Sequence, residues 1–215
     1  MICDNLTRVN ARIQALDTDN RVTLIAVSKT KPASDLQQAI DCGQRHFGEN
    51  YLQEALEKID ALQGQELIWH FIGPIQSNKT ASIAEHFDWV HSVDRLKIAK
   101  RFNDQRPNEL GVLNVLLQIN IDNEPSKSGV LPEQVPEMVA AFSAFERLNL
   151  RGFMCIPKPG QADQSFEKMT AIAGDYPQLD TLSMGMSGDL ESAIAHGATF
   201  VRIGTDIFGA RNYQA

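Results

Sequence analysis

Strand-like and helix-like segments alternate along this chain, and this alternation constrains the fold more than any other feature. The first pair is the β-branched segment 22–28 (VTLIAVS), followed by helical spacing that starts near Ser34 and stops at Gly43. The pattern recurs roughly every 23 residues up to the carboxyl end. Neighbouring parallel strands need a crossover connection, so the alternation predicts an all-parallel sheet covered by helices.

Eight strands are expected, with one extra helix over residues 3–16 in front of them. The predicted strands cover residues 22–28, 45–50, 67–73, 89–93, 112–121, 150–157, 179–186 and 199–209. The predicted helices between them cover residues 34–43, 51–63, 77–87, 94–105, 132–146, 163–174 and 188–197.

The number of strands favours a closed (β/α)8 TIM barrel over an open doubly wound sheet. The open sheet usually carries a Gly-rich G-x-G-x-x-G turn after its first strand, whereas the first strand here runs into Ser28-Lys29-Thr30-Lys31-Pro32. No linker or low-complexity segment divides the chain. We therefore expect residues 1–215 to form a single α/β barrel domain.

Composition and charge exclude several classes of partner. With 20 Lys and Arg against 27 Asp and Glu, the net charge is −7 and the pI is near 5.2. This balance gives no general attraction to nucleic acid or to an anionic membrane. The amino terminus lacks the apolar core of a signal peptide, and no apolar run approaches the roughly 20 residues of a membrane span. A cytoplasmic protein is expected.

The three cysteines, Cys3, Cys42 and Cys155, form no C-x-x-C motif and no Cys/His array. Their odd number and wide spacing argue against a disulfide framework and against a zinc site. We therefore expect three reduced thiols and no bound metal.

Small residues follow the last two predicted strands, at the end of a barrel where active sites lie. Ser187 and Gly188 precede a helix that begins at Asp189, and Gly204 and Thr205 follow the eighth strand. Such turns free backbone N–H groups beside hydroxyls, which can hold an anion, and barrels often bind phosphate after strands 7 and 8. The alternative is that the glycines only permit tight turns and that Ser187 caps the next helix.

Lys29 is the candidate for covalent chemistry because it directly follows an apolar strand. In a barrel mouth, desolvation would lower its pKa and leave a neutral amine that can form an imine with an aldehyde. Lys31 competes for this role, but it is one step further out and precedes Pro32. An imine beside a phosphate site suggests pyridoxal 5′-phosphate. The alternative is a lysine that has already emerged into solvent.

Arg202 lies inside the apolar segment FVRIG, where a guanidinium is costly to bury without a partner. One candidate partner is the pyridine nitrogen of the cofactor, which an arginine keeps unprotonated, so that the ring becomes a weak electron sink. The alternative is a structural ion pair with a strand-end acid such as Glu49. His70 and His91 also stand at strand ends, and without a second group paired to either we interpret both as hydrogen-bonding residues rather than bases.

Six ordered motifs resemble those of a known family: AVSKTKP (26–32), HFGENYLQE (46–54), WHFIGPIQSNK (69–79), INIDNEPSKSG (119–129), LSMGMSGDLESAI (182–194) and VRIGTDIFGAR (201–211). They are similar, nearly letter for letter, to the pyridoxal phosphate homeostasis proteins of the YggS/PROSC type, over almost the whole chain. The resemblance implies a fold-type III barrel like the amino-terminal domain of alanine racemase.

The resemblance also implies a site for pyridoxal 5′-phosphate. In that site Lys29 would hold the cofactor as an imine and Arg202 would contact the pyridine nitrogen. The phosphate and the two faces of the cofactor would be bound by Ser187, Gly204, Thr205, Asn50 and Met184.

A protein of this family is thought to hold and supply pyridoxal 5′-phosphate, and to act in its homeostasis and in amino-acid and keto-acid balance without established catalysis. A racemase of this fold takes one acid/base from a second, β-rich domain across a dimer. Here the chain ends ten residues after Thr205, so we expect no such domain, no catalytic residue and a monomer. Tyr213 in the tail is a poor substitute. Transient contact with apo-enzymes that need the cofactor is expected.

Two alternatives stay open. One is a small racemase or lyase that uses the same cofactor, and the other is a barrel for some other sugar or nucleotide phosphate, with Lys29 in an ion pair. Lys127, in a turn after the fifth strand, is a hypothetical transient acceptor of the aldehyde during loading or release. The alternative for Lys127 is a solvated loop lysine.

Overall fold

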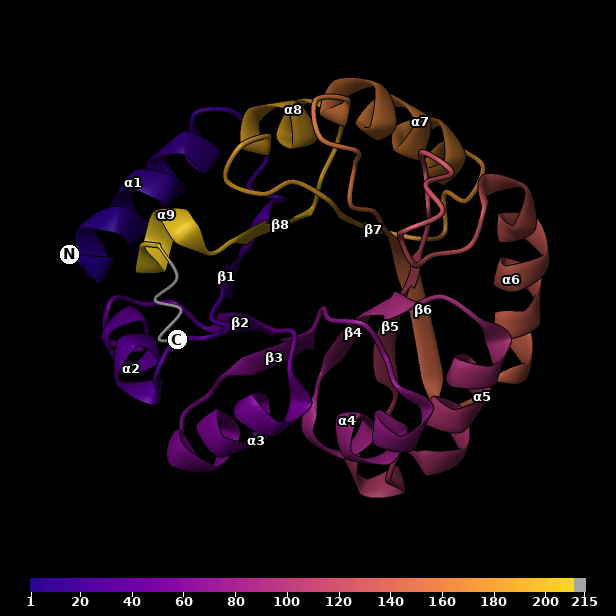
Figure 1. Cartoon of the computed structure of the whole chain (residues 1–215), viewed down its shortest axis with the longest axis horizontal. Helices are drawn as coiled ribbons and strands as arrows, with labels where there is room; N and C mark the ends of the chain where they lie inside the picture. The colour runs from indigo at the N-terminus through magenta and orange to yellow at the C-terminus, as the bar shows by residue number, and fades with distance from the viewer. Residues whose placement is uncertain (211–215) are drawn as a thin grey trace.

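The computed structural model describes residues 1–210, and its centre is a closed barrel of parallel strands. Each strand pairs with the next one along the chain, and β8 returns to β1 to close the ring (Figure 1). The predicted (β/α)8 barrel is therefore confirmed. The strands are β1 Thr23–Val27, β2 His46–Glu49, β3 Ile68–Phe71, β4 Trp89–Val93, β5 Leu113–Gln118, β6 Leu148–Met154, β7 Thr181–Ser183 and β8 Phe200–Ile203.

Helices cover the outside of the barrel, so that each strand reaches its parallel neighbour through a crossover. No helix within residues 1–210 is long and apolar enough to cross a membrane. The α-helices are α1 Ile2–Gln14, α2 Ala33–Asp41, α3 Leu52–Ala61, α4 Thr80–His86, α5 Leu96–Gln105, α6 Val135–Ala141, α7 Ala162–Gly174, α8 Leu190–Ala195 and α9 Thr205–Phe208. Short 3₁₀ helices lie at η1 Ser77–Lys79, η2 Asn108–Leu110, η3 Pro132–Gln134 and η4 Phe142–Ala144.

Two segments that the sequence predicts to be single elements are each divided into shorter ones. The segment 199–209, expected to be one strand, is the short strand β8 followed by the single-turn helix α9, because its pairing with β1 ends at Ile203. The segment 132–146, expected to be one helix, is divided into η3, α6 and η4. Both η3 and α6 carry a proline in their first turn, where the missing N–H costs no helical hydrogen bond.

The predicted amino-terminal helix is confirmed, and it completes the ring of helices. α1 packs against α2, α8 and α9, and its inner face is formed by Ile2, Leu6, Val9 and Ile13 at helical spacing. Because α9 is only four residues long, α1 covers the part of the barrel near β1 and β8 that a longer last helix would cover (Figure 1).

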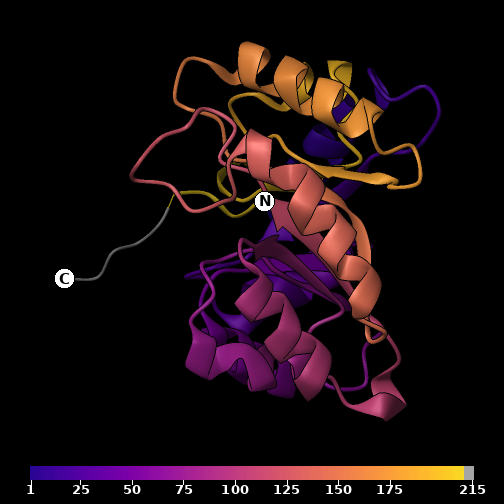
Figure 2. The same ribbon diagram turned by 90° about the vertical axis from the view of Figure 1, so that its right-hand side faces the viewer.

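The core has two apolar regions, one between the barrel and the helices and one inside the barrel. The inner region is made of Ile25, Trp89, Leu116, Met154 and Phe200. Side chains therefore fill the barrel below its mouth. In Figure 2 the loop after β5 (pink) and the chain near residue 210 (yellow) extend from the same end of the barrel. The room for a ligand lies at this end, where the strands finish.

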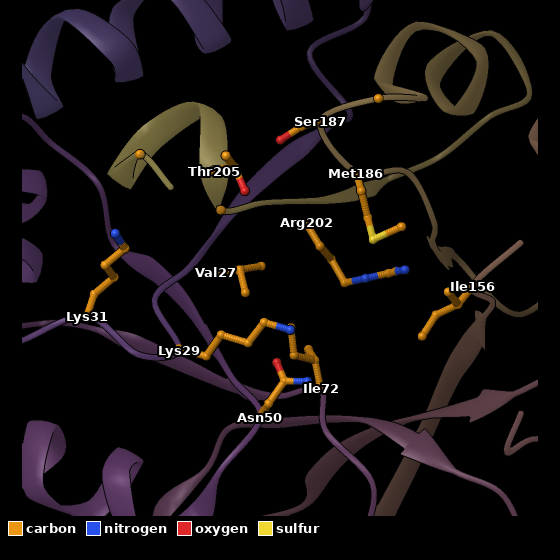
Figure 3. A pocket seen from close by; sticks show the side chains of 13 residues that line it. Val27, Lys29, Lys31, Asn50, Ile72, Ile156, Met186, Ser187, Arg202 and Thr205 are labelled. Atoms are coloured by element: carbon orange, nitrogen blue, oxygen red, sulfur yellow. The ribbon is translucent and has the colours of Figure 1, made fainter. Parts of the chain in front are cut away.

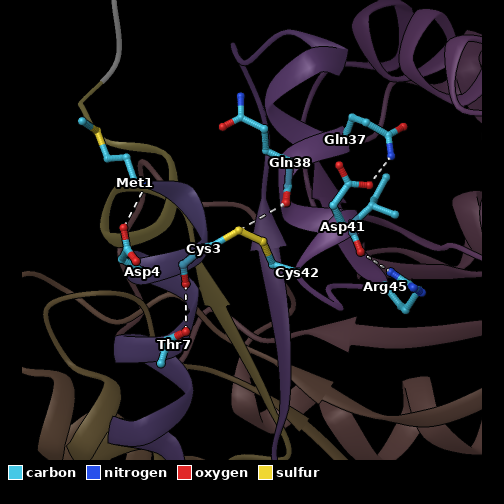
Figure 4. Close-up of a disulfide and its surroundings, with 10 residues drawn as sticks. Met1, Cys3, Asp4, Thr7, Gln37, Gln38, Asp41, Cys42 and Arg45 are labelled. Carbon is cyan, nitrogen blue, oxygen red and sulfur yellow. Dashed lines mark hydrogen bonds and ion pairs between the residues drawn. A yellow bond between two sulfur atoms is a disulfide. The ribbon is translucent and has the colours of Figure 1, made fainter.

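The expectation of three reduced thiols is wrong for two of them. A disulfide joins Cys3 on α1 to Cys42 at the end of α2, with their Cα atoms 5.6 Å apart (Figure 4). The two cysteines are 39 residues apart in the chain, and they meet because α1 packs alongside α2, which their spacing does not reveal. Cys155 is a free thiol inside the fold, and burial raises its pKa to about 12.

Candidate functional site

A cavity of about 250 Å³ opens at the carboxyl ends of the strands. All the predicted site residues except Met184 line it, although they come from four different strand ends (Figure 3). The described residues that line it are Val27, Lys29, Lys31, Asn50, Ile72, Ile156, Met186, Ser187, Gly188, Arg202, Gly204, Thr205 and Gly209.

The small residues after β7 and β8 meet at one end of this cavity. The side chains of Ser187 and Thr205 lie close to each other in Figure 3, with hydroxyl groups at the cavity edge. A Cβ on Gly204 would lie 3.1 Å from the Val27 carbonyl oxygen, so β8 approaches β1 closely here. Ser187 does not cap the next helix, because α8 begins after Asp189. The arrangement offers hydroxyls and glycine backbone to an anion.

Arg12 on α1 supports this end of the cavity from behind. Its guanidinium donates to Asp206 Oδ2 (2.8 Å), to Glu191 Oε1 (2.9 Å) and to the Ser187 carbonyl oxygen (3.4 Å). The hydrogen bond from Arg12 lowers the pKa of Glu191. Arg12 therefore ties α1, α8 and α9 together and offsets the charge of two carboxylates that lie near the proposed anion end.

The two candidate lysines point in different directions. The half-buried Lys29 extends its side chain into the cavity, toward Asn50 and Ile72 in Figure 3. Lys31 turns its amine away and donates to the carbonyl oxygens of Phe208 (3.0 Å) and Ala210 (2.9 Å). The geometry therefore favours Lys29 for chemistry inside the cavity.

Asn50 and Met186 line other parts of the cavity wall. Asn50 Oδ1 is buried and has no hydrogen-bond partner within residues 1–210. The loop after β3 packs onto the Asn50 backbone, since a Cβ on Gly73 would lie 2.2 Å from the Asn50 carbonyl oxygen. Met184 is fully buried in the region between barrel and helices, while Met186 borders the cavity because Gly185, at φ +95°, turns the chain after β7.

Arg202 on β8 borders the cavity and is 5% exposed. Its Nη1 donates to Ser183 Oγ (2.7 Å) and its Nη2 to the Cys155 carbonyl oxygen (2.9 Å). Burial lowers the pKa of Arg202 from its ordinary value. The alternative partner considered for it is wrong, because Glu49 lies 2.7 Å from Lys58 Nζ.

A chain of hydrogen bonds continues from Ser183 through the barrel interior. His91 Nδ1 lies 2.8 Å from Ser183 Oγ, and His91 Nε2 lies 2.9 Å from His70 Nδ1. His70 Nε2 in turn lies 3.0 Å from His46 Nδ1. Burial lowers the pKa of His70 and His91 well below the usual value, so both rings are neutral at pH 7. This agrees with their interpretation as hydrogen-bonding residues.

One direction of this chain gives an acceptor to each donor from Arg202 Nη1 to His70 Nε2. A guanidinium only donates, so Ser183 Oγ accepts from Arg202 and its own hydrogen can go to His91 Nδ1. His91 then donates from Nε2 to His70, and His70 donates from Nε2 to His46. In this arrangement all three histidines are Nε2–H tautomers, and the Ser183 hydroxyl and the Nε2–H groups of His91 and His70 each have an acceptor while Arg202 is held in place.

A second cavity of about 190 Å³ adjoins the first and shares Asn50, Ile72 and Ile156 with it. Lys127 lies on its wall, at the mouth of the barrel as the sequence indicates. The Lys127 amine donates to the Pro157 carbonyl oxygen (2.8 Å) and lies 2.9 Å from Glu124 Oε2. Its hydrogen bond also lowers the pKa of Glu124.

The sequence analysis missed four residues that shape this site: Arg12, Lys58, Ser183 and Met186. Arg12 and Lys58 are charged residues on helices, and Arg12 is 194 residues from its partner Asp206, so neither carries a local signal. Ser183 could have been found, because alternation along β7 places it on the inward face with Thr181.

Comparisons with known proteins agree with this geometry. The family model of the alanine racemase N-terminal domain matches residues 4–212. The pyridoxal phosphate homeostasis protein of Escherichia coli (strain K12) is 53% identical over 229 residues, which cover 99% of this chain and 98% of that protein. The protein of the same name from Pseudomonas aeruginosa is 54% identical over 224 residues, which cover 100% and 97%.

Solved structures show the same fold. PipY of Synechococcus elongatus PCC7942, solved with PLP bound, has a TM-score of 0.88 at 34% identity and covers 97% of this chain and 100% of its own. An alanine racemase from Corynebacterium glutamicum shares the fold alone, with a TM-score of 0.71 at 15% identity over 98% of this chain and 60% of that one. From the family model and the two bacterial relatives, the chain belongs to the alanine racemase N-terminal domain family and, within it, to the pyridoxal phosphate homeostasis proteins.

Proposed function

We propose that this protein binds pyridoxal 5′-phosphate covalently through Lys29, and that it holds and supplies the cofactor rather than catalysing a reaction with it. The observation that carries the proposal is one cavity that brings together the Lys29 amine, the Arg202 guanidinium and the hydroxyls of Ser187 and Thr205. The names of its relatives and the PLP bound to PipY support the same cofactor.

The residues of the cavity fit the chemical groups of this cofactor. Ser187, Gly204 and Thr205 offer an end for the phosphate, and Arg202 supplies a donor for the pyridine nitrogen. The buried and unpartnered Asn50 Oδ1 offers an acceptor beside them. Met184 was predicted to lie on one face of the cofactor, but Met186 is better placed for that contact.

Lys29 would make the covalent linkage. Its amine, in the neutral form, would add to the aldehyde carbon, a C=N bond would form, and the aldehyde oxygen would leave as water with the two amine hydrogens. When bound, the cofactor supplies an electron sink for carbanion chemistry, and a guanidinium on its ring nitrogen weakens that sink. Arg202 is kept in place for this contact by Ser183 and the Cys155 carbonyl oxygen.

The cavity wall supports a role without catalysis. A racemase needs an acid/base on each face of the substrate. Within residues 1–210, the cavity lining includes no Asp, Glu, His, Cys or Tyr, which leaves the two lysines as the titratable groups apart from Arg202. Tyr213, considered as a substitute, lies outside the described residues. We further propose a cytoplasmic monomer that contacts apo-enzymes transiently when it delivers the cofactor.

Spectroscopy tests the proposal directly. Added pyridoxal 5′-phosphate is expected to give the absorbance band of an imine, and borohydride is expected to fix the cofactor on Lys29, as located by peptide mass spectrometry. Lys29→Ala should lose both signals, because Lys31, the other lysine among the described lining residues, directs its amine to the carbonyl oxygens of Phe208 and Ala210. Lys97→Ala, on the exposed side of α5, is the matched control and should keep both.

Three outcomes would contradict parts of this proposal. Borohydride trapping that fails in the unmodified protein would favour a barrel for a different phosphate compound. Trapping that persists in Lys29→Ala would assign the linkage to another lysine. Racemisation of alanine or serine that disappears in Lys29→Ala would favour the enzymatic alternative.

A further inference from the structure

Lys29 lies in a tight turn with an unusual backbone. The Lys31 N–H donates to the Ser28 carbonyl oxygen (3.1 Å), so residues 28–31 form a turn with Lys29 and Thr30 at its centre. Thr30 has φ +64°, a value that a type II turn requires at this position and that favours Gly or Asn. A β-branched residue in this conformation is strained, and such strain persists only where neighbouring contacts enforce it.

One buried ammonium group supplies those contacts. Lys58 on α3 is 4% exposed, and its Nζ donates to the Ser28 carbonyl oxygen (2.7 Å), to Glu49 Oε1 (2.7 Å) and to Glu54 Oε1 (2.6 Å). These three bonds use all the donors of the ammonium.

The two carboxylates that contact Lys58 also accept hydrogen bonds from the residues on either side of Lys29. Glu49 Oε1 accepts the hydroxyl of Ser28 at 2.6 Å, and Glu54 Oε1 accepts the N–H of Thr30 at 2.5 Å. The residues before and after Lys29 are therefore held by the same charge cluster. The cluster lies behind the sheet and outside the ligand cavity, since none of its three charged residues lines that cavity.

We propose that Lys58, with Glu49 and Glu54, is a positioning device that holds residues 28–30 in the strained turn and so keeps the Lys29 amine aimed into the cavity before a ligand arrives. This inference rests on the proposed function, because it assigns the device to the lysine that condenses with the aldehyde.

The physical argument is one of preorganisation. A lysine side chain has many rotamers, and a displacement of the reacting amine by about 1 Å can slow a reaction by about a hundredfold. Buried ion pairs contribute little net stability compared with apolar residues of similar size. A buried cluster of three charges that contacts both neighbours of a reactive residue is therefore better explained by placement of that residue than by stability alone.

The test compares three variants in the full chain. Glu54→Leu removes the acceptor for the Thr30 N–H, and Glu54→Gln restores an acceptor without the charge. Thr30→Gly leaves the cluster intact and removes the penalty for positive φ, so the turn no longer needs the cluster to hold its backbone. Glu57→Leu makes the same change as Glu54→Leu at an exposed position of the same helix and serves as the control.

The measured quantities are the rate of imine formation with pyridoxal 5′-phosphate, the melting temperature, and amide hydrogen exchange at Thr30 in protein without ligand. Glu54→Leu is expected to slow imine formation by about ten- to a hundredfold, as for a misplaced reacting group, whereas Thr30→Gly should keep the unmodified rate and should restore it when combined with Glu54→Leu. Glu54→Leu should also expose the Thr30 amide to exchange, and Glu54→Gln should recover most of the rate. Thr30→Gly should keep or raise the melting temperature, because glycine adopts positive φ without strain.

Imine formation at the unmodified rate in Glu54→Leu would overturn the inference, and so would a slow rate that Thr30→Gly fails to restore. If Glu54→Leu does not fold, Ser28→Ala takes its place, because it removes the other side-chain contact between the cluster and the turn and should also slow imine formation. If the unmodified chain forms no imine, the proposed function fails, whereas a normal imine at Lys29 with insensitive variants rejects only the positioning device.

Discussion

At the residue scale, the path of the backbone gives two nearby lysines different surroundings. Lys29 and Lys31 lie two positions apart, yet one amine enters the cavity and the other caps the carbonyl groups of Phe208 and Ala210. The sequence favoured Lys29 because it comes directly after an apolar strand, and the geometry of the cavity favours the same lysine. The partners of Lys31, 177 and 179 residues away, had no local signal.

The hydroxyls of Ser187 and Thr205 should discriminate between pyridoxal 5′-phosphate and pyridoxal. Ser187→Ala and Thr205→Ala are each expected to weaken pyridoxal 5′-phosphate binding by about tenfold or more, since a hydrogen bond to a charged group contributes about 1.5–3 kcal/mol. Pyridoxal, which lacks the phosphate, should bind each variant within about twofold of the unmodified protein, because the lost bond is absent from both complexes. Titration of the absorbance band measures both affinities. Equal losses for the two ligands would place the phosphate elsewhere.

At this scale the sequence identifies a constrained residue where its type is costly to bury at its position. Arg202 was singled out because a guanidinium in an apolar strand needs partners, and it has them in Ser183 and Cys155. The choice of Met184 over Met186 could not be made in this way. The turn at Gly185 decides which of the two methionines reaches the cavity, and its backbone angle is not visible in the sequence.

At the element scale, the strands could be predicted because each is a short apolar run with a helix after it. Helix α9 was missed because the residues that form it, TDIF, continue the apolar pattern of β8. The contact between α1 and α2 was also beyond prediction, since it depends on how the ring of helices closes. The error about Cys3 and Cys42 has this same cause.

Thiol titration tests the link between α1 and α2. Protein purified without reductant and then unfolded should show one reactive thiol, that of Cys155, and three after reduction. Cys42→Ser is expected to lower the free energy of unfolding by about 2–4 kcal/mol relative to the oxidised protein, because the unfolded chain loses a covalent constraint. Reduced protein is the control and should unfold like the variant. Three reactive thiols before reduction would restore the original expectation.

At the scale of the whole molecule, the barrel contains a polar path surrounded by apolar side chains. The path runs from Arg202 at the mouth through His91 and His70 to His46, the first residue of β2. The residues of this path come from five parts of the chain, so it could not be assembled from sequence even though His70 and His91 were noticed. The closed fold brings these residues together.

The neutral histidines predict a dependence of stability on pH. Their pKa is lowered in the folded state, so the unfolded chain binds more protons below pH 6.5, and stability is lost as the pH falls. Between pH 6.5 and 5.5, His70 and His91 together should remove about 2 kcal/mol from the free energy of unfolding.

Urea unfolding at the two pH values measures this loss, and His70→Leu should reduce it by about half, because one group no longer titrates. A variant with the full pH dependence of the unmodified protein would show that His70 is not the group responsible. Loss of stability in the opposite direction, toward higher pH, would show that the ring is protonated in the folded state.

The pairing of β8 with its two neighbouring strands is uneven. β8 aligns with β1 at four positions but with β7 at only one, Ser183 opposite Phe200. The cavity lies across this short seam, with Lys29 after β1 on one side of β8 and Ser187 after β7 on the other. A ligand that fills the cavity bridges this seam, and by mass action its binding free energy adds to the free energy of unfolding of the barrel. Release of the ligand and loss of this stability are therefore the same thermodynamic process.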